Sequence, residues 1–324
     1  MTPEPSDAVT TIVPAEPTGP AGSVDPEAGP GPALAAGIAG VEADAAPQTR
    51  RRLRILLHDP GTLVSGAFLL LVLAVTVLAP LIAPHDPSST DLQARFASPL
   101  SDGHLLGTDD LGRDLFSRLL HAGRVSLLVG LGSVALAMVI AVPIGLLAGY
   151  VGGKTDAVLS AAINVVLSVP PLILVFTVAG ILGPSVRNVV IALAIYFVPV
   201  FVRLVRSEVK VLRYGQLVET ERAIGISDTR IVLRHVLPNI SASVIVQASL
   251  NVGTAILAEA SLSFLGLGVR PPTPSWGVML RDAYDYVRIE SWVVFVPGIT
   301  VALVVFALNV FGDGLRDALG RVTR

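Results

Sequence analysis

Long apolar stretches separated by short charged segments dominate the chain after residue 60. The first stretch, 61–83, holds no charged residue, and at about 1.5 Å per residue it is long enough to cross a hydrocarbon core of about 30 Å. Five more stretches follow, at 125–153, 157–186, 188–202, 240–269 and 291–312. The pattern predicts an all-α, polytopic membrane protein with six transmembrane helices.

Two of these stretches contain helix-breaking residues. Pro143, Gly145 and Gly149 lie in the second stretch, and the sequence SVPP occupies 168–171 in the third. In membranes such residues allow close helix packing, or a break that faces a cavity. The fourth stretch spans only about 22 Å if helical, but Arg187 and Arg203 can extend their side chains outward and let it cross.

Composition agrees with a membrane protein and excludes several other classes. Of the 324 residues, 52% are hydrophobic and 15% are charged. The mean hydropathy of +0.71 lies outside the usual soluble range. A net charge of −2 offers no basic field for nucleic acid. The absence of cysteine excludes disulfides, thiolate metal sites and a cysteine nucleophile.

The distribution of charge predicts the organisation of the chain. Residues 1–48 contain nine prolines, seven acidic residues and no Lys or Arg, which predicts a disordered cytoplasmic tail. With the N-terminus inside, 15 of the 23 Lys and Arg residues fall on the cytoplasmic side, so both termini are expected there. The first helix and an external loop then occupy 49–124, the transmembrane core 125–313 and a cytoplasmic tail 314–324.

The largest predicted cytoplasmic loop, 203–239, ends in the charged sequence ETERAIGISDTRIVLRHVLPN. Gly225 is expected to end a first helix in a left-handed conformation, and Ser227 or Asp228 to cap a second helix beginning at Thr229. Pro238 is expected to stop that helix near the membrane. The result would be a compact knob that could fit a groove on a partner. Its apolar anchors would be Ile224, Ile226, Ile231 and Leu233.

This loop resembles the EAA loop of ABC-transporter permeases, which pairs a glutamate and two small residues with a later glycine and Leu-Pro. The matching positions are Glu219, Gly225, Leu237 and Pro238, while Thr220 and Glu221 replace the small residues and His235 replaces an isoleucine. The resemblance implies that the loop couples the permease to an ATPase. The coupling residues would be Glu219, Thr220, Glu221, Ala223, Gly225, Ser227, Asp228, Leu237 and Pro238.

Three further motifs are similar to the dipeptide/oligopeptide/nickel permease family (DppC/OppC type). They are HLLGTDDLGRDLFSRLLHAGR from His104, EASLSFLGLGVRPPTPSWGVML from Glu259 and FGDGLRDAL from Phe311. The likeness implies a type I ABC importer permease fold and half of a heterodimeric channel. Its partners would be a second permease subunit, two cytoplasmic ATPases and an external solute-binding protein. The implied cargo is a di- or oligopeptide, with nickel or another small solute as the alternative.

Other activities find little support in the residues. GGKT at 152–155 is not a P-loop, because Ala148 stands where the motif requires its first glycine. All five histidines lie outside the predicted spans, so no base could activate a serine within the membrane, and no HExxH zinc motif is present. A secondary transporter would be expected to carry carboxylates near the bilayer centre. We therefore expect a transport subunit rather than an enzyme, with no cofactor and no metal site.

Two groups of polar residues outside the loop are candidate sites. Glu259 is the only ionisable residue within a predicted span, and it is expected near the outer interface. With Ser261 and Ser263 it could line a gate or pathway; a structural role, a substrate contact and proton coupling are the alternatives. Five charged residues have helical spacings that suit an exposed external helix, either merely solvated or docking the binding protein or partner permease. They are Asp109, Asp110, Arg113, Asp114 and Arg118.

Overall fold

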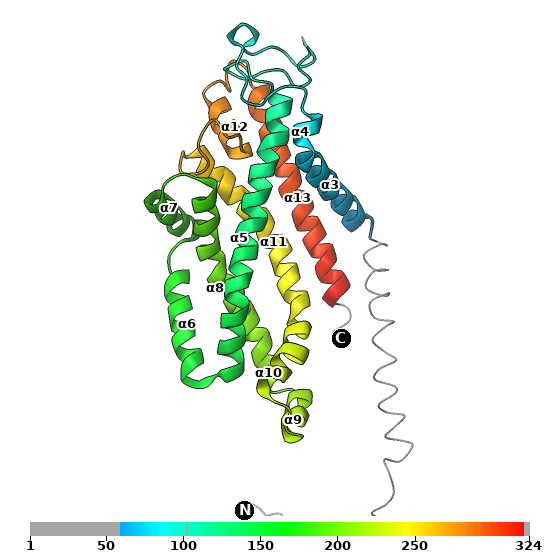
Figure 1. The fold of residues 1–324 in the computed structure, drawn as a ribbon, viewed down its shortest axis with the longest axis vertical. Coiled ribbons are helices and arrows are strands. Elements are labelled where there is room, and N and C mark those ends of the chain that lie inside the picture. Colours follow the sequence, from blue (N-terminus) through cyan, green and yellow to red (C-terminus); the bar gives the residue numbers. More distant parts are fainter. Residues whose placement is uncertain (1–58, 102, 321–324) are drawn as a thin grey trace, which may run out of the picture. The chain divides into compact units, whose positions relative to one another are not determined.

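The computed structural model describes residues 59–101 and 103–320, which form helices joined by loops (Figure 1). Within this part of the chain strand-type pairing is confined to two isolated bridges, so the all-α prediction is confirmed. The predicted tail, 1–48, lies outside the described residues. Hydrogen-bonding side chains set where several helices begin. These N-caps are Asp59, Asp114, Ser185 and Ser275.

Among the described residues, five helices are long and apolar enough to cross a membrane. They are α3 (Pro60–Val77), α5 (Leu115–Val151), α8 (Val186–Arg213), the run through α10 (Asp228–Ile231) and α11 (Leu237–Phe264), and α13 (Trp292–Gly320). Short elements outside them include α4 (Ala79–Ile82), the 3-10 turn η1 (Leu92–Ala94) and α12 (Trp276–Tyr284). The short fourth stretch crosses because α8 continues to Arg213 and reaches about 42 Å.

The predicted third span is not one straight helix. It consists of α6 (Gly153–Leu167) and α7 (Pro171–Leu182), whose axes are bent by 86°. Pro170 and Pro171 lack the backbone N–H groups that would continue the hydrogen bonds of α6, so the chain breaks there and α7 begins at Pro171. Six spans are present only if this bent pair counts as one.

Small residues let α5 pack closely against α8. A β-carbon on Gly145 would lie 2.6 Å from Cβ of Val205, and one on Gly149 would lie 2.8 Å from Cβ of Val209. These glycines, four residues apart on one helix face, therefore bring the two backbones together, as small residues do in membrane helices. Asp156 of α6 adds a polar tie to α8 through Arg206 and Lys210. For this glycine pair the packing interpretation is confirmed.

The remaining helices complete the bundle around α5. α11 packs against α5 and α13, and α13 packs against α3 (Figure 1). α12 contacts α11, α13 and the start of α5. α9 (Gln216–Ala223) and α10 lie at the opposite end of the bundle from α12. The two polar regions predicted from the sequence, at 109–118 and 219–238, therefore sit at opposite ends.

Candidate functional site

The end of α9 turns sharply through Gly225. This residue has a φ of +83°, a left-handed conformation that glycine adopts without penalty. The Gly225 N–H donates to the Arg222 carbonyl at 3.0 Å, and the Ile226 N–H donates to the Glu221 carbonyl at 3.0 Å. These two bonds form a Schellman motif, which closes the helix and reverses the chain. Gly225 therefore ends the first helix of the loop in a left-handed conformation, as predicted.

The second helix of the loop does not stop at Pro238. After α10 come five π-helical residues, Val232–Val236, and α11 then begins at Leu237. The Leu237 N–H donates to the Val232 carbonyl, five residues back. This wider turn precedes the proline, whose missing N–H then falls in the first turn of α11, where it costs little. The expectation of a stop is wrong, and Asp228–Phe264 forms one rod of 37 residues, about 55 Å long.

We call residues 216–236 the knob. Two of its four predicted apolar anchors are on its surface: the Ile224 side chain is 70% exposed and the Leu233 side chain 58%. Ile231 is fully buried and Ile226 packs partly against the core, so these two hold the knob to its own chain. Leu233 also lines a concave surface together with Ser227, Thr229, Arg230 and Arg234. The knob thus exposes Ile224 and Leu233, and Leu233 lies beside two arginines.

Seven of the nine predicted coupling residues lie in the knob, and Leu237 and Pro238 follow it in the first turn of α11. Most are exposed, and Glu221 and Leu237 are half-buried. Asp228 is turned toward α5, where it accepts a hydrogen bond from the Tyr150 hydroxyl at 2.7 Å. It also pairs with Arg222 at 3.1 Å, and the Arg222 guanidinium lies 5.0 Å from the Tyr150 ring centre. Tyr150 therefore fastens the knob to the end of α5, a role with no sequence signal because 78 residues separate it from Asp228.

Two departures from the loop pattern face each other. Glu221 Oε1 lies 2.9 Å from His235 Nε2, which joins α9 to the π-helical segment. The other carboxylate oxygen of Glu221 is buried and has no hydrogen-bond partner among the described residues. Glu221 replaces a small residue of the EAA pattern, and His235, which replaces an isoleucine, provides its polar partner. The pair replaces apolar packing with a polar contact.

Glu259 is buried inside the bundle. Its carboxylate accepts hydrogen bonds from Ser126 Oγ of α5 at 2.8 Å and from Ser263 Oγ at 2.7 Å. Ser126 also accepts from the Trp276 N–H of α12 at 3.3 Å. Glu259 and Ser126 therefore join α11, α5 and α12, and Ser263 adds a bond within α11. Ser261 lies apart from them, on an apolar cleft between α11, α12 and α13.

The predicted exposed helix at 109–118 is wrong, because α5 begins only at Leu115 and four of the five charged residues are buried. Arg113 Nε lies 2.6 Å from Asp109 Oδ2, and Arg118 Nε lies 3.4 Å from the same oxygen. Both arginines also pair with Asp282 of α12, at 3.5 and 3.6 Å. We call Asp109, Arg113, Arg118 and Asp282 the charged cluster. Asp282 could not be predicted as a member of the cluster, because 169 residues separate it from Arg113 along the chain.

The surface beside the charged cluster is polar and open. Asp110, Arg113, Arg281 and Asp285 line a cleft of about 400 Å³ there. Burial, reinforced by the charge of Asp109, raises the pKa of the Asp110 carboxyl. Asp114 does not belong to the cluster; it caps α5 by accepting from the Ser117 N–H at 2.7 Å. Arg113 thus belongs both to the buried charged cluster and to the lining of the open cleft.

Comparison with known proteins identifies the family. Residues 141–324 match the binding-protein-dependent transport system inner membrane component, and residues 48–99 match the N-terminal TM domain of oligopeptide transport permease C. The di/tripeptide transport system permease protein DppC of Pseudomonas aeruginosa is 44% identical over 267 residues, covering 81% of this chain and 88% of that protein. The glutathione transport system permease protein GsiD of Pectobacterium atrosepticum is 40% identical over 266 residues, covering 82% and 88%.

A solved structure shares the fold. An inward-facing structure of the MetNI methionine ABC transporter aligns with a TM-score of 0.53 at 20% identity, covering 65% of this chain and 98% of the matched one. With the apolar helices and the family matches, this places the chain in the membrane as a multi-pass transport subunit with the type I importer fold. The chain belongs to the family of binding-protein-dependent transport system inner membrane components, the permease subunits of ABC importers.

Proposed function

We propose that this permease forms half of an ATP-driven import pathway for di- and oligopeptides. The other half would be a second permease subunit, served by two cytoplasmic ATPases and an external solute-binding protein. Relatives named for di/tripeptides and for glutathione, itself a tripeptide, support a peptide cargo over nickel. The Lys and Arg distribution supports termini and knob on the cytoplasmic side.

The observation that carries this proposal is the continuity of the knob with α11. A partner that binds Leu233 holds one end of the Asp228–Phe264 rod, and Glu259 near the other end is bonded to α5. A rigid helix moves as a unit, so a displacement of the knob by the ATPases would shift the contacts at the far end. Energy from ATP would reach the pathway by mechanical displacement.

The polar cleft between α8, α11 and α13 supports a pathway on this side of the bundle. It has a volume of about 510 Å³, and its lining includes Asn239, three residues after the knob. Polar side chains from all three helices line it, among them Glu208, Gln247 and Arg316. Such groups can bind the amide groups and charged ends of a peptide while access to the cleft alternates between the two sides of the membrane.

Replacing one exposed anchor of the knob tests this function. We expect Leu233→Asp to weaken binding of the ATPase subunits by tenfold or more and to abolish peptide uptake, because a charge would enter an apolar contact. Pull-down of the ATPase and ATP-driven uptake of labelled dipeptide by proteoliposomes measure the two effects. Leu105→Asp is the matched control, an exposed leucine at the other end of the bundle. Equal ATPase binding by both variants would contradict the proposal, and uptake of Ni²⁺ instead of peptide would overturn the assigned cargo.

A further inference from the structure

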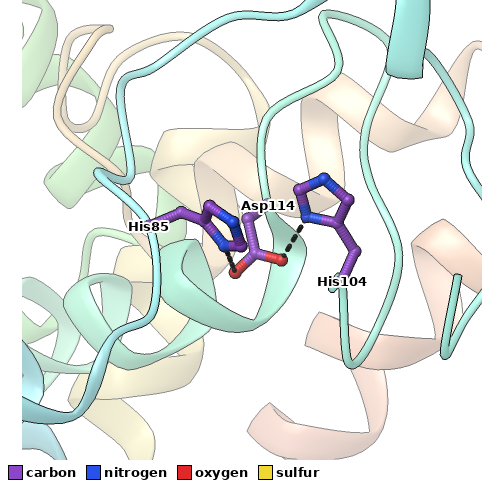
Figure 2. A group of neighbouring side chains, drawn as sticks. All are labelled: His85, His104 and Asp114. Carbon is purple, nitrogen blue, oxygen red and sulfur yellow. Dashed lines mark hydrogen bonds and ion pairs between the residues drawn. The ribbon is translucent and has the colours of Figure 1, made fainter. Parts of the chain in front are cut away.

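Two histidines and an aspartate converge where α5 begins. His85 follows α4, His104 lies in the loop before α5, and Asp114 is the residue that caps α5. Figure 2 shows both imidazole rings beside the carboxylate, approaching its two oxygens. One nitrogen or oxygen ligand atom from each residue lies within 4.8 Å of the other two. Three possible metal ligands from separate segments thus meet at one point.

The carboxylate of Asp114 is buried without a permanently charged partner. Its side chain is 0% exposed, and its ion-pair partners among the described residues are the two histidines. A buried carboxylate needs a compensating positive charge. The first turn of α5 supplies only a partial charge through the Ser117 N–H. A cation held between the carboxylate and the imidazoles would supply the rest.

The distances suit an ion shared by the three groups. His104 Nδ1 lies 2.9 Å from Asp114 Oδ1, whereas His85 Nδ1 lies 3.9 Å from Oδ2, too far for a hydrogen bond. Ligand atoms around a tetrahedral Zn²⁺, at bonds of about 2.0–2.1 Å, are about 3.3 Å apart. The two separations, each to a different oxygen of the carboxylate, lie on either side of that value, and all three ligand atoms lie within 4.8 Å of one another. A small rotation of the half-exposed His85 ring would bring its nitrogen to the ion.

The backbone holds the three residues in place. The His85 N–H donates to Ser117 Oγ at 3.2 Å, which ties this loop to the first turn of α5. The His104 N–H donates to the Ser101 carbonyl at 2.8 Å, and the His104 carbonyl accepts from the Gly107 N–H at 3.1 Å. Ligand-bearing segments fixed in this way form a site that needs little rearrangement to bind.

We propose that His85, His104 and Asp114 bind one divalent cation of the zinc class. Two imidazole nitrogens and one carboxylate oxygen favour Zn²⁺ over Mg²⁺ and Ca²⁺, which prefer oxygen ligands. The His85 side chain is 40% exposed, so water can reach the ion and occupy a fourth position. The ion would fasten the loop after α4 to the first turn of α5, independently of the solute transported.

Equilibrium dialysis with Zn²⁺ tests this site. The full-length chain is purified in detergent without a polyhistidine tag, stripped with chelator and dialysed against micromolar Zn²⁺ in excess Mg²⁺. We expect one Zn²⁺ per chain, and at least tenfold weaker binding for His85→Ala and for His104→Ala, since even the loss of an outer-shell partner costs about 10–100-fold. His121→Ala is the control, because His121 lies on α5 and bonds the Ser117 carbonyl instead.

Thermal unfolding gives a second readout. Zn²⁺ should raise the unfolding midpoint of the wild-type chain and of His121→Ala, but not that of His85→Ala, because a ligand that binds only the folded state stabilises it. His85 is half-exposed, so its loss should leave the apo fold intact. The proposal would be overturned if the wild-type chain bound less than half an equivalent of Zn²⁺. It would also be overturned if His85→Ala bound Zn²⁺ as tightly as the wild type.

Discussion

At the α12 end of the bundle, Arg113 and Arg118 are buried between Asp109 and Asp282, whereas in the knob Arg222 pairs with Asp228 on an exposed surface. Burial makes each member of the charged cluster costly to remove, because the remaining charges are left without water or partner. The exposed pair is screened by solvent and can exchange partners at little cost. One end is therefore built as a rigid support, and the other as a surface free to bind.

The two ends also differ in what lies beneath them. Below the charged cluster, Glu259, Ser126 and Trp276 bond α11, α5 and α12 to one another. The knob is held mainly by Tyr150 and by the buried Ile231. A rod fixed at one end and lightly held at the other can transmit a displacement applied to its free end. Four experiments would break or sharpen this comparison.

The largest expected effect is that cysteines placed at the two ends of the bundle are labelled from opposite sides of the membrane. A cysteine at Thr220, on the exposed face of α9, should react with an impermeant thiol reagent only from the cytosol, and a cysteine at Leu105 only from outside. The chain contains no native cysteine, so each label reports one position. Labelling of both positions from the same side would show that the ends do not face opposite compartments.

Arg118→Met should destabilise the chain by about 3–5 kcal/mol, since it leaves Asp109 and Asp282 short of a buried partner. Arg222→Met in the knob should cost at most about 1 kcal/mol, because its pair is exposed. Thermal unfolding of both variants in detergent measures the contrast. Similar losses would mean that the two regions are equally rigid.

Gly225→Leu should leave the chain inserted and folded but weaken binding of the ATPase. A β-carbon at Gly225 meets no atom within 4 Å, so the cost comes from the left-handed backbone, about 1–2 kcal/mol. Relief of that strain would reshape the turn between Arg222 and Ser227. Gly225→Asn is the control, since asparagine tolerates this conformation. Pull-down with ATPase binding equal to wild type would show that the turn geometry is not needed for docking.

The smallest effect concerns the polar pair within the knob. His235→Ile alone should destabilise the knob by about 1 kcal/mol, because Glu221 is then left half-buried without its partner. Adding Glu221→Ala should recover most of this loss by restoring small and apolar packing. A double-mutant cycle followed by thermal unfolding or hydrogen exchange measures the coupling. Additive effects would mean that the two residues act independently.

Much of the fold could be predicted because it depends on local composition. Apolar stretches such as 61–83 and 291–312 must be helical to satisfy their backbone in a membrane, and Gly225 marks a turn by its own conformational freedom. The helix boundaries were predicted less accurately. The second span was expected to begin at residue 125, but α5 begins ten residues before that, at Leu115, because Asp114 caps it. Predicting Pro238 as a stop failed because a preceding π-helical turn carries the chain across it.

The sequence by itself determined that the chain is a membrane-embedded helical permease with a protruding loop, since hydrophobic length, charge placement and a short motif are local properties. Only the tertiary structure decided how the charged residues are used. Arg118 meets Asp282, Glu259 meets Ser126, and Glu221 meets His235 through folding of distant or reversed segments. Charge pairing depends on distance in space and on burial, and neither quantity can be obtained from spacing along the chain.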